Sequence, residues 1–395
     1  MRALHDGHGR SVRYLRLSVT DRCNLRCLYC RSNAKQRCIP HEQVLRYEEM
    51  ARMVGIAASL GIGKVRLTGG EPFARKGCGQ FLAMLHARFP DMDLRVTTNG
   101  TLLEPHIPLL RRIGVSAVNL SLDSFDRETF ARVTGRDLLP PVLAALDGLL
   151  AAGVRVKINV VAMRGVNDGQ MDDFVHAART MPLDLRFIEF MPMGSGTLWS
   201  PENFWSADDI REEAARRARL IPVSPDEPGA EAESGPARMY RIEGGQGRLG
   251  FISPLTNHFC LTCNRLRLTS EGALRTCLFA DKEYRLRGLL RHPRITDEIL
   301  AGVIRRACAD KPVGADLLRA RRAGAAVADR WWASEADVHV ERLCRWRRLL
   351  RGPDRHFCQT RRRKCGFQPG YGHQNQFHPG ADLGYCALYR RGQRP

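Results

Sequence analysis

Between residue 11 and about residue 220, short β-rich segments alternate with amphipathic helical segments, and this alternation restricts the folds open to the chain. We expect six strands, at Val12–Val19, Lys64–Thr68, Leu94–Thr98, Ala117–Leu122, Val154–Val161 and Leu185–Phe190. Helical patterns lie between them, at Glu48–Leu60, Gln80–Arg88, Leu139–Ala152 and Asp168–Thr180. Such alternation implies parallel strands joined by right-handed crossovers. The predicted fold is therefore α/β, a partial (β/α)6 TIM-like barrel.

Most of the chemically distinctive motifs follow directly after one of these strands. They are the cysteine loop at 23–30, Gly69-Gly70-Glu71-Pro72, Thr97-Thr98-Asn99-Gly100, Ser121-Leu122-Asp123 and Glu189-Phe190-Met191-Pro192. The carboxyl ends of parallel strands meet at one end of a barrel, which is where barrel active sites form. The sequence therefore predicts that these motifs share one site.

The first motif is a cysteine triad, Cys23, Cys27 and Cys30, with the spacing C-x3-C-x2-C. Three thiolates on one loop can hold three irons of a [4Fe–4S] cluster and leave the fourth iron free to bind a small molecule. The alternatives are a zinc knuckle and three unrelated buried thiols. Zinc usually requires a fourth close ligand, and the nearest spare cysteine, Cys38, is eight residues further on. We favour the cluster.

A second triad follows in Cys260, Cys263 and Cys277, again with three close ligands. A second [4Fe–4S] cluster with one open iron is our preferred interpretation. The alternative is structural zinc with His258 as fourth ligand, although a residue two positions before Cys260 has a poor reach for tetrahedral closure.

Several cationic positions indicate an anionic ligand. Arg265 and Arg267 alternate after the second triad, so on an extended segment they point the same way and can grip a phosphate or a purine edge. Arg16, Arg66 and Lys157 lie within or beside predicted strands. The alternatives are a solvated strand face for the first pair and snorkelling edge residues for the others.

Charge and composition limit the function classes. The net charge is +20, from 62 Lys and Arg against 42 Asp and Glu. Residues 311–395 contain 16 Arg and 2 Lys against 7 acidic residues, so over half of the excess lies in the last fifth of the chain. The remaining excess fits a polyphosphate site and does not require nucleic acid. We find no membrane span or signal peptide and expect a cytoplasmic protein with reduced thiols.

Composition also predicts three regions. Residues 1–222 form the barrel, residues 223–312 follow a Pro- and Gly-rich segment and carry the second triad, and residues 313–395 form an Arg-rich tail without sustained periodicity. We expect the tail to be disordered. The tail has four cysteines, Cys344, Cys358, Cys365 and Cys386. No two of them form a CxxC pair, so we expect no metal site there.

Together these motifs resemble the GTP 3',8-cyclase family, the radical S-adenosylmethionine (SAM) enzymes of the first step of molybdenum cofactor biosynthesis. The resemblance covers about residues 10–312 and rests on TDRCNLRCLYC, RLTGGEP, TTNG, LSLDS, RFIEFMPMG and ISPLTNHFCLTCNRLRLTSEGALRTCLF. It implies a barrel of the radical SAM type with a C-terminal auxiliary-cluster domain.

The resemblance also implies roles for individual residues. The first triad would hold the cluster that binds SAM, and the second triad would hold an auxiliary cluster that binds the guanine of GTP. The implied SAM contacts are Tyr29, Gly70, Glu71, Ser121 and Met191. The implied GTP contacts are Arg16, Arg66, Thr97, Lys157, Arg265 and Arg267.

The implied reaction is reductive cleavage of SAM to a 5'-deoxyadenosyl radical, which abstracts the ribose 3'-hydrogen so that C3' attacks C8 of the purine. The cofactors carry this chemistry and the protein orients them. The family further implies a cyclic pyranopterin monophosphate synthase as the next enzyme and a homodimer, while the electron donor is not specified.

The chain departs from the family at its end, where relatives carry two glycines and this sequence reads Gly392-Gln393-Arg394-Pro395. We hypothesise intact sites but impaired turnover, which a product assay with and without a synthetic peptide of the usual tail would test. Normal turnover without the peptide would contradict it. Two other functions stay open at this point: a peptide-modifying radical SAM enzyme and a zinc-dependent nucleic-acid-binding protein.

Overall fold

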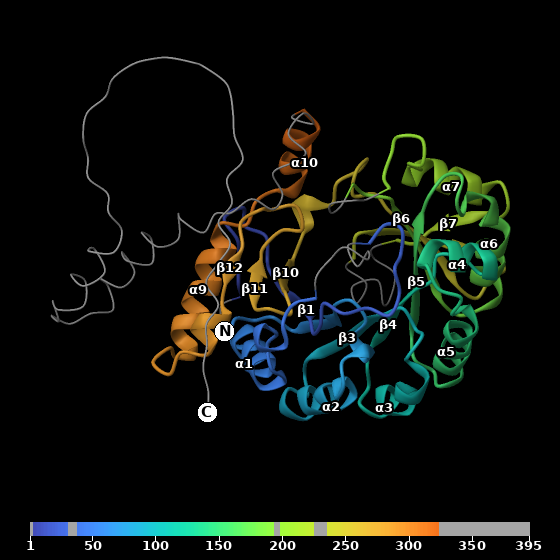
Figure 1. Ribbon diagram of the computed structural model, residues 1–395. Helices are drawn as coiled ribbons and strands as arrows, with labels where there is room; N and C mark the ends of the chain where they lie inside the picture. Colours follow the sequence, from blue (N-terminus) through green and yellow to red (C-terminus); the bar gives the residue numbers. More distant parts are fainter. Residues whose placement is uncertain (1–2, 31–37, 193–197, 225–234, 324–395) are drawn as a thin grey trace, which may run out of the picture. The chain divides into compact units, whose positions relative to one another are not determined.

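Six parallel strands stand side by side, in chain order, at the centre of the sheet of this computed structural model (Figure 1). They are β1 (Tyr14–Ser18), β2 (Lys64–Thr68), β3 (Asp93–Thr98), β4 (Ala117–Ser121), β5 (Val156–Ala162) and β6 (Asp184–Glu189). Each strand pairs in parallel with the next. The six predicted strands are all present, and the prediction of a partial α/β barrel is confirmed.

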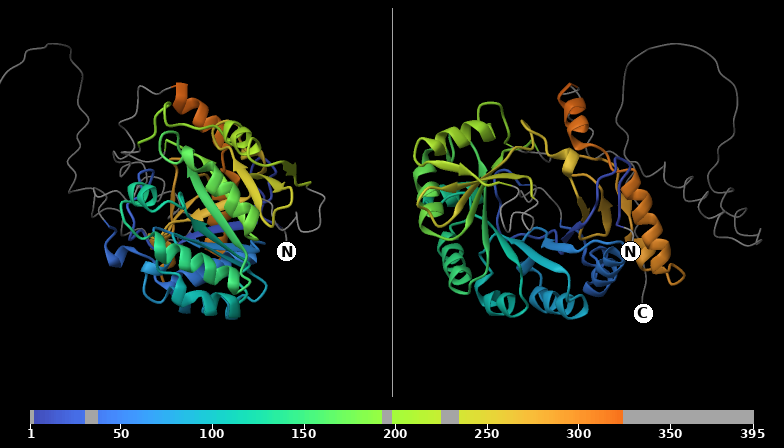
Figure 2. Two further views of the ribbon diagram at one scale, coloured as in Figure 1. Left: turned by 90° about the vertical axis from the view of Figure 1, so that its right-hand side faces the viewer. Right: turned by 180° about the vertical axis from the view of Figure 1, so that it is seen from behind.

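Helices connect these strands and cover the outer face of the curved sheet (Figures 1 and 2). They are α1 (Tyr47–Ser59), α2 (Cys78–Arg88), α3 (Ile107–Arg112), α4 (Arg127–Thr134), α5 (Leu139–Ala151) and α6 (Met171–Thr180). The sequence pattern did not predict α3 and α4, which have only 6 and 8 residues. Helices this short span too few turns to show a clear helical period.

Alternation along the strands directs apolar side chains toward the helices and polar side chains toward the concave face. In β1, Leu15 and Leu17 belong to the main apolar core and are 2% and 0% exposed. Arg16 lies between them, and β2 repeats this order around Arg66. Because successive side chains of a strand point to opposite faces, burying the leucines on one side places the arginines on the other.

Strands from the C-terminal half extend the parallel sheet at both ends. β9 (Arg248–Ile252) pairs in parallel with β6, and β10 (Arg265–Leu268) pairs in parallel with β1. Beyond them lie the antiparallel strands β8 (Ala237–Ile242), β7 (Leu220–Pro222), β11 (Ala273–Arg275) and β12 (Tyr284–Arg285). Over the described residues β7 and β12 are the two edges, so the barrel is open.

The structure describes residues 3–30, 38–192, 198–224 and 235–323, all within a unit that spans residues 1–328. Its remaining helices are α7 (Ala207–Ala215), α8 (Arg287–Leu290), α9 (Asp297–Ala309) and α10 (Gly314–Ala323). Strands from both sides of residue 222 share one sheet, and the division into regions 1–222 and 223–312 stays a prediction. Most of the expected tail, with its four cysteines, lies outside the described residues. No described helix is long and apolar enough to cross a lipid bilayer.

Candidate active site

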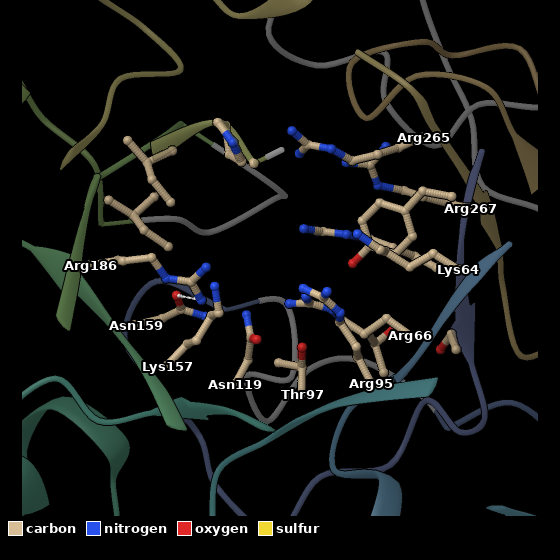
Figure 3. A pocket seen from close by; sticks show the side chains of 18 of the residues that line it. Lys64, Arg66, Arg95, Thr97, Asn119, Lys157, Asn159, Arg186, Arg265 and Arg267 are labelled. Atoms are coloured by element: carbon tan, nitrogen blue, oxygen red, sulfur yellow. Dashed lines mark hydrogen bonds between the residues drawn. The ribbon is translucent and has the colours of Figure 1, made fainter. Parts of the chain in front are cut away.

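A cavity of about 400 Å³ lies on the concave face of the barrel sheet (Figure 3). Side chains of β1 to β6 and of β10 line it, and in Figure 3 Arg186 of β6 lies on the side opposite Arg265 and Arg267 of β10. Its described lining includes no Asp or Glu. The cationic lining residues are Arg16, Lys64, Arg66, Arg95, Lys157, Arg186, Arg265, Arg267 and Arg275. The cavity is therefore built for an anion.

The strand register brings four of these cations into one row. Arg16 stands opposite Arg267 on one neighbouring strand and opposite Arg66 on the other. Arg66 in turn stands opposite Arg95. Residues at matching positions of paired strands point to the same face, so the row forms a continuous cationic wall from β10 to β3.

Some of the cations form ion pairs with carboxylates at the amino ends of the strands, Asp93 at the start of β3 and Asp184 at the start of β6. Asp93 lies 2.9 Å from Arg95 and 3.5 Å from Lys64. Asp184 lies 3.1 Å from the Nζ atom of Lys157. These aspartates are themselves outside the cavity lining.

Other lining arginines have no such partner. Among the described residues, those that form no ion pair are Arg16, Arg66, Arg186, Arg265 and Arg267. Arg186 donates to the side-chain oxygen of Asn159 at 2.8 Å, and its Nε atom has no partner (Figure 3). The Nε atoms of Arg16 and Arg66 are also buried without one. Unpaired buried cations are costly, and a polyanion in the cavity would offset that cost.

The pKa values of three lining cations are lowered by burial. Burial lowers the pKa of Arg66 to about 9 against the opposing effect of Tyr14, and Arg16 makes a smaller lowering contribution. Burial, followed by Arg16 and Arg265, lowers the pKa of Arg267 to about 9. Burial lowers the pKa of Lys157 to about 7 against the attraction of Asp184. A bound anion would favour the charged form of each group.

All six residues that the family resemblance assigned to GTP line this cavity. Sequence reasoning missed other polar lining residues, which include Tyr14, Lys64, Arg95, Asn119, Asn159 and Arg186. Most of them occupy the same alternating positions as the predicted ones. Asn119, for example, stands between Thr97 and Lys157 in the register. The period-two pattern of each strand was the signal that could have found them.

The first cysteine triad follows β1, whose last residue, Ser18, lines the cavity. Cys23 and Cys27 are partly buried and Cys30 is exposed. The Cys23 sulfur accepts from the backbone N–H of Leu25 at 3.4 Å and from the side-chain amide of Asn99 at 3.7 Å. Burial, and then the Glu71 carboxylate and Cys30, raise the pKa of the Cys23 thiol. Thiolates in this setting need the positive charge of a metal centre, which fits an iron–sulfur cluster.

The glycine turn after β2 packs directly against the segment that leads to this triad. A Cβ atom on Gly70 would lie 2.1 Å from the carbonyl oxygen of Arg22, and one on Gly69 would lie 2.4 Å from that of Thr20. Gly69 also has a φ of +149°. Both positions therefore require glycine, and the turn packs against the backbone that leads into the cysteine loop.

Glu71 ties this turn to the loop after β3. Its side chain is fully buried, at 0% exposure. Its carboxylate accepts from the backbone N–H of Phe73 at 3.1 Å, the hydroxyl of Thr98 at 2.8 Å and the backbone N–H of Asn99 at 2.7 Å. These bonds give Glu71 a bracing role, and its contact with SAM stays a prediction.

The other predicted SAM contacts lie at the same end of the barrel. The Tyr29 hydroxyl donates to Asp123 at 2.5 Å, which ties the cysteine loop to the segment after β4. Ser121 is the last residue of β4. Met191 follows β6 and packs against a small apolar cluster whose buried members include Cys277.

The second triad borders the cavity through β10, which begins at Arg265, two residues after Cys263. A Cβ atom on Gly314 would lie 2.9 Å from the Cys277 sulfur and 3.4 Å from the Cys260 sulfur, so these two thiols flank the start of α10. The Nδ1 atom of His258 is buried without a hydrogen-bond partner.

In the described part of the chain, no three Cys, His, Asp or Glu side chains form a group that could hold a single metal ion. In a [4Fe–4S] cluster each thiolate binds a different iron, so three cysteines in each triad would leave one iron of a cluster without a protein ligand.

Comparisons with known families and proteins agree with this geometry. The radical SAM superfamily matches residues 17–178, and the family described as Molybdenum Cofactor Synthesis C matches residues 183–317. A GTP 3',8-cyclase of Thermodesulfovibrio yellowstonii is 42% identical over 305 residues, covering 76% of this chain and 92% of that protein. A GTP 3',8-cyclase of Rhodobacter capsulatus is 44% identical over 317 residues, covering 79% and 92%.

Solved structures match the fold. The crystal structure of Streptococcus suis SuiB bound to S-adenosylmethionine superimposes with a TM-score of 0.52 and 13% identity, covering 78% of this chain and 73% of that chain. SuiB bound to its precursor peptide SuiA gives a TM-score of 0.51 at 14% identity, covering 78% and 67%. Identity this low indicates a common architecture only.

Proposed function

The chain belongs to the GTP 3',8-cyclase family, and on that premise we propose that the cationic cavity is its GTP-binding site. The chain is a radical SAM enzyme of molybdenum cofactor biosynthesis, which cyclises GTP to (8S)-3',8-cyclo-7,8-dihydroguanosine 5'-triphosphate. The observation that carries the binding proposal is the set of lining arginines without carboxylate partners. A triphosphate supplies several negative charges, and arginine binds phosphate oxygens in pairs.

We propose that the two ends of GTP meet different parts of the cavity. Arg265 and Arg267 lie next to the second triad, where the guanine would bind, and their forked guanidinium groups suit a purine edge. Arg16, Arg66 and Lys157 line the sheet side of the cavity and would bind the triphosphate, with Thr97 as a neutral donor between them. This arrangement fixes the ribose between the triads.

The enzyme uses two [4Fe–4S] clusters and SAM. We propose that Cys23, Cys27 and Cys30 hold one cluster and that Cys260, Cys263 and Cys277 hold the other. When bound, the first cluster supplies the electron for reductive cleavage of SAM. We propose that Gly70, which allows the close approach of the cysteine loop, contacts SAM together with Tyr29, Glu71, Ser121 and Met191.

The role of the protein side chains is then to bind, orient and shield. The barrel face excludes water from the reacting atoms, and the cations hold GTP so that C3' lies toward SAM and C8 lies near the same ribose face. No side chain of the site needs to act as a general acid or base in this scheme.

On family resemblance alone, we further propose a cytoplasmic enzyme that passes its product to cyclic pyranopterin monophosphate synthase. The same resemblance proposes a homodimer and an electron donor of unspecified identity. No nucleic-acid partner is needed to explain the cationic cavity, because GTP itself is the polyanion.

An anaerobic assay tests this function. The reconstituted protein is incubated with GTP, SAM and dithionite. The products are separated by chromatography, and their masses are determined by mass spectrometry. We expect 5'-deoxyadenosine together with a nucleotide of the same mass as GTP but different retention, and no such isomer when ATP replaces GTP. Formation of 5'-deoxyadenosine without a nucleotide isomer, with either nucleotide and also after addition of a synthetic peptide of the usual family tail, would contradict the assignment of GTP.

A further inference from the structure

Lys311 is buried beside the second triad, at 2% exposure. Its ammonium group donates three hydrogen bonds: to the Cys263 sulfur at 3.4 Å, to the Arg265 carbonyl at 2.9 Å and to the Thr276 carbonyl at 2.9 Å. All three donors of the ammonium are therefore used. Among the described residues, Lys311 forms no ion pair with a carboxylate.

A buried ammonium without a carboxylate needs a negative charge from another source. The acidic residue in the neighbouring N-terminal segment, Asp6, is held by Arg10 at 2.6 Å. Of the three partners of Lys311, two are neutral carbonyls and only the Cys263 sulfur can carry a charge. The thiolate that a cluster requires at Cys263 would supply that countercharge.

The position of Lys311 is fixed from two sides. It follows α9, and its backbone N–H donates to the carbonyl of Cys308 at 2.9 Å. Arg10 donates to the carbonyls of Lys311 and Pro312, each at 3.1 Å, and to the carbonyl of Cys260 at 2.7 Å. The N-terminal segment thus clamps the Lys311 backbone to the cysteine loop, which keeps the ammonium directed at the sulfur.

We propose that Lys311 is a positioning residue for the auxiliary cluster: its ammonium hydrogen-bonds the Cys263 thiolate and stabilises the more negative, reduced form of the cluster. Hydrogen bonds and charges near cluster sulfurs are established means of setting a reduction potential. The inference rests on the proposed function, because it needs a cluster at the second triad.

Among the described residues, no cationic side chain hydrogen-bonds the Cys23 sulfur of the first triad. The Cys23 sulfur accepts only from neutral amide groups, those of Leu25 and Asn99. After burial, the carboxylates of Glu71 and Asp123 contribute to raising the pKa values of the Cys23 and Cys27 thiols, respectively. In the part of the chain that the structure describes, the two triads therefore differ: carboxylates act on the first, and the Lys311 ammonium contacts a sulfur of the second.

The test uses a full-length background variant, C23A/C27A/C30A, in which only the auxiliary cluster can form. In this background we compare K311M, which removes the charge and all three donors, with K282M, which removes an exposed lysine paired with Asp310 at 2.7 Å. EPR-monitored redox titration measures the midpoint potential, and iron analysis gives the cluster content, about four irons per chain for one cluster. We expect K311M to shift to a more negative potential and K282M to keep the parent value.

Retention of about four irons by K311M with the parent potential would overturn the proposal. If K311M loses the cluster, a second measurement on protein that keeps Lys311 tests the proposal. The protein is labelled with ε-15N-lysine, and HYSCORE spectra of the reduced cluster should show a weak 15N coupling. The K311R variant in the same background should lack that coupling. Absence of that coupling overturns the proposal. A background variant that binds no iron at all would instead overturn the auxiliary cluster itself, and with it the proposed function.

Discussion

At the scale of single residues, the site depends on guanidinium groups whose charge has no partner within the described chain. Arg186 is an instructive case because its position on β6 faces the cavity from the side opposite Arg265 (Figure 3). It is 8% exposed, and among the described residues its guanidinium group hydrogen-bonds only the neutral side-chain amide of Asn159. Such a group is poorly stabilised without a ligand, so its removal should affect binding more than folding.

We therefore expect Arg186→Ala to weaken GTP binding by roughly 10- to 100-fold, since a hydrogen bond to a charged group contributes about 1.5–3 kcal/mol. Anaerobic isothermal titration measures the dissociation constant. Arg127→Ala is the matched control, because Arg127 pairs with Asp137 on the surface and is 67% exposed. A change of less than about twofold for Arg186→Ala would argue against its role.

Lys157 should make GTP binding depend on pH. With a pKa of about 7 in the free protein, the ammonium is largely deprotonated at higher pH, whereas a bound triphosphate favours the charged form. Binding above about pH 7 then takes up a proton, and the affinity falls as pH rises, by up to about tenfold per pH unit. Titration in buffers of different ionisation enthalpy measures this uptake. Lys157→Met should show weaker binding without the slope, and a slope equal to the parent's would contradict the assignment.

At the scale of elements, the loops after β1, β2 and β3 form one interlocked unit. The glycine turn touches the backbone of Arg22, and Glu71 hydrogen-bonds the loop that contains Thr98 and Asn99. Asn99 in turn reaches the Cys23 sulfur. Disturbing one loop should therefore disturb the first triad while leaving the second triad intact.

Gly70→Ala tests this coupling. Its Cβ atom would lie 2.1 Å from the Arg22 carbonyl oxygen, so the cysteine loop must move. We expect the reconstituted variant to retain about four irons per chain in place of about eight, because only the auxiliary cluster remains. Gly63→Ala, at the other end of β2 where the added atom meets open space, is the control. Full iron content in Gly70→Ala would show that the close approach is not needed.

The sequence pattern predicted the central strands because each is local, buried on its helix-facing side and followed by a recognisable motif. It did not predict that β9 pairs with β6 or that β10 pairs with β1. Those partners lie about 60 and about 250 residues apart in the chain, and no local period encodes such pairing. Alternation within a strand could have placed Lys64, Arg95 and Arg186 on the concave face, but it could not show that this face meets β10 in one cavity.

The residues that hold the second triad in place could not be predicted from the sequence either. Arg10 and Lys311 come from opposite ends of the described chain and meet only in the folded protein. Neither belongs to a cysteine motif. In contrast, the six cysteines and the alternating pair Arg265 and Arg267 could be predicted, because ligand spacing and strand alternation are local properties.

At the scale of the whole molecule, the two triads lie next to strands β1 and β10, which both line one cavity, and the described charges near them differ. Carboxylates lie near the first triad, and Lys311, Arg265 and Arg267 lie near the second. In the fully loaded protein we expect the auxiliary cluster to be reduced first as the potential is lowered. An EPR titration, with C23A/C27A/C30A to assign the signals, measures the order, and reduction of the SAM-binding cluster first would contradict this expectation.

The most direct test of the central claim follows the hydrogen that GTP loses. Only a ribose held between the two triads, with C3' toward SAM, can pass its 3'-hydrogen to the 5'-deoxyadenosyl group. GTP deuterated at C3' should therefore give 5'-deoxyadenosine that carries one deuterium, measured by mass spectrometry after a single anaerobic turnover. Unlabelled 5'-deoxyadenosine formed from the same substrate would show that the cavity does not hold GTP in this way.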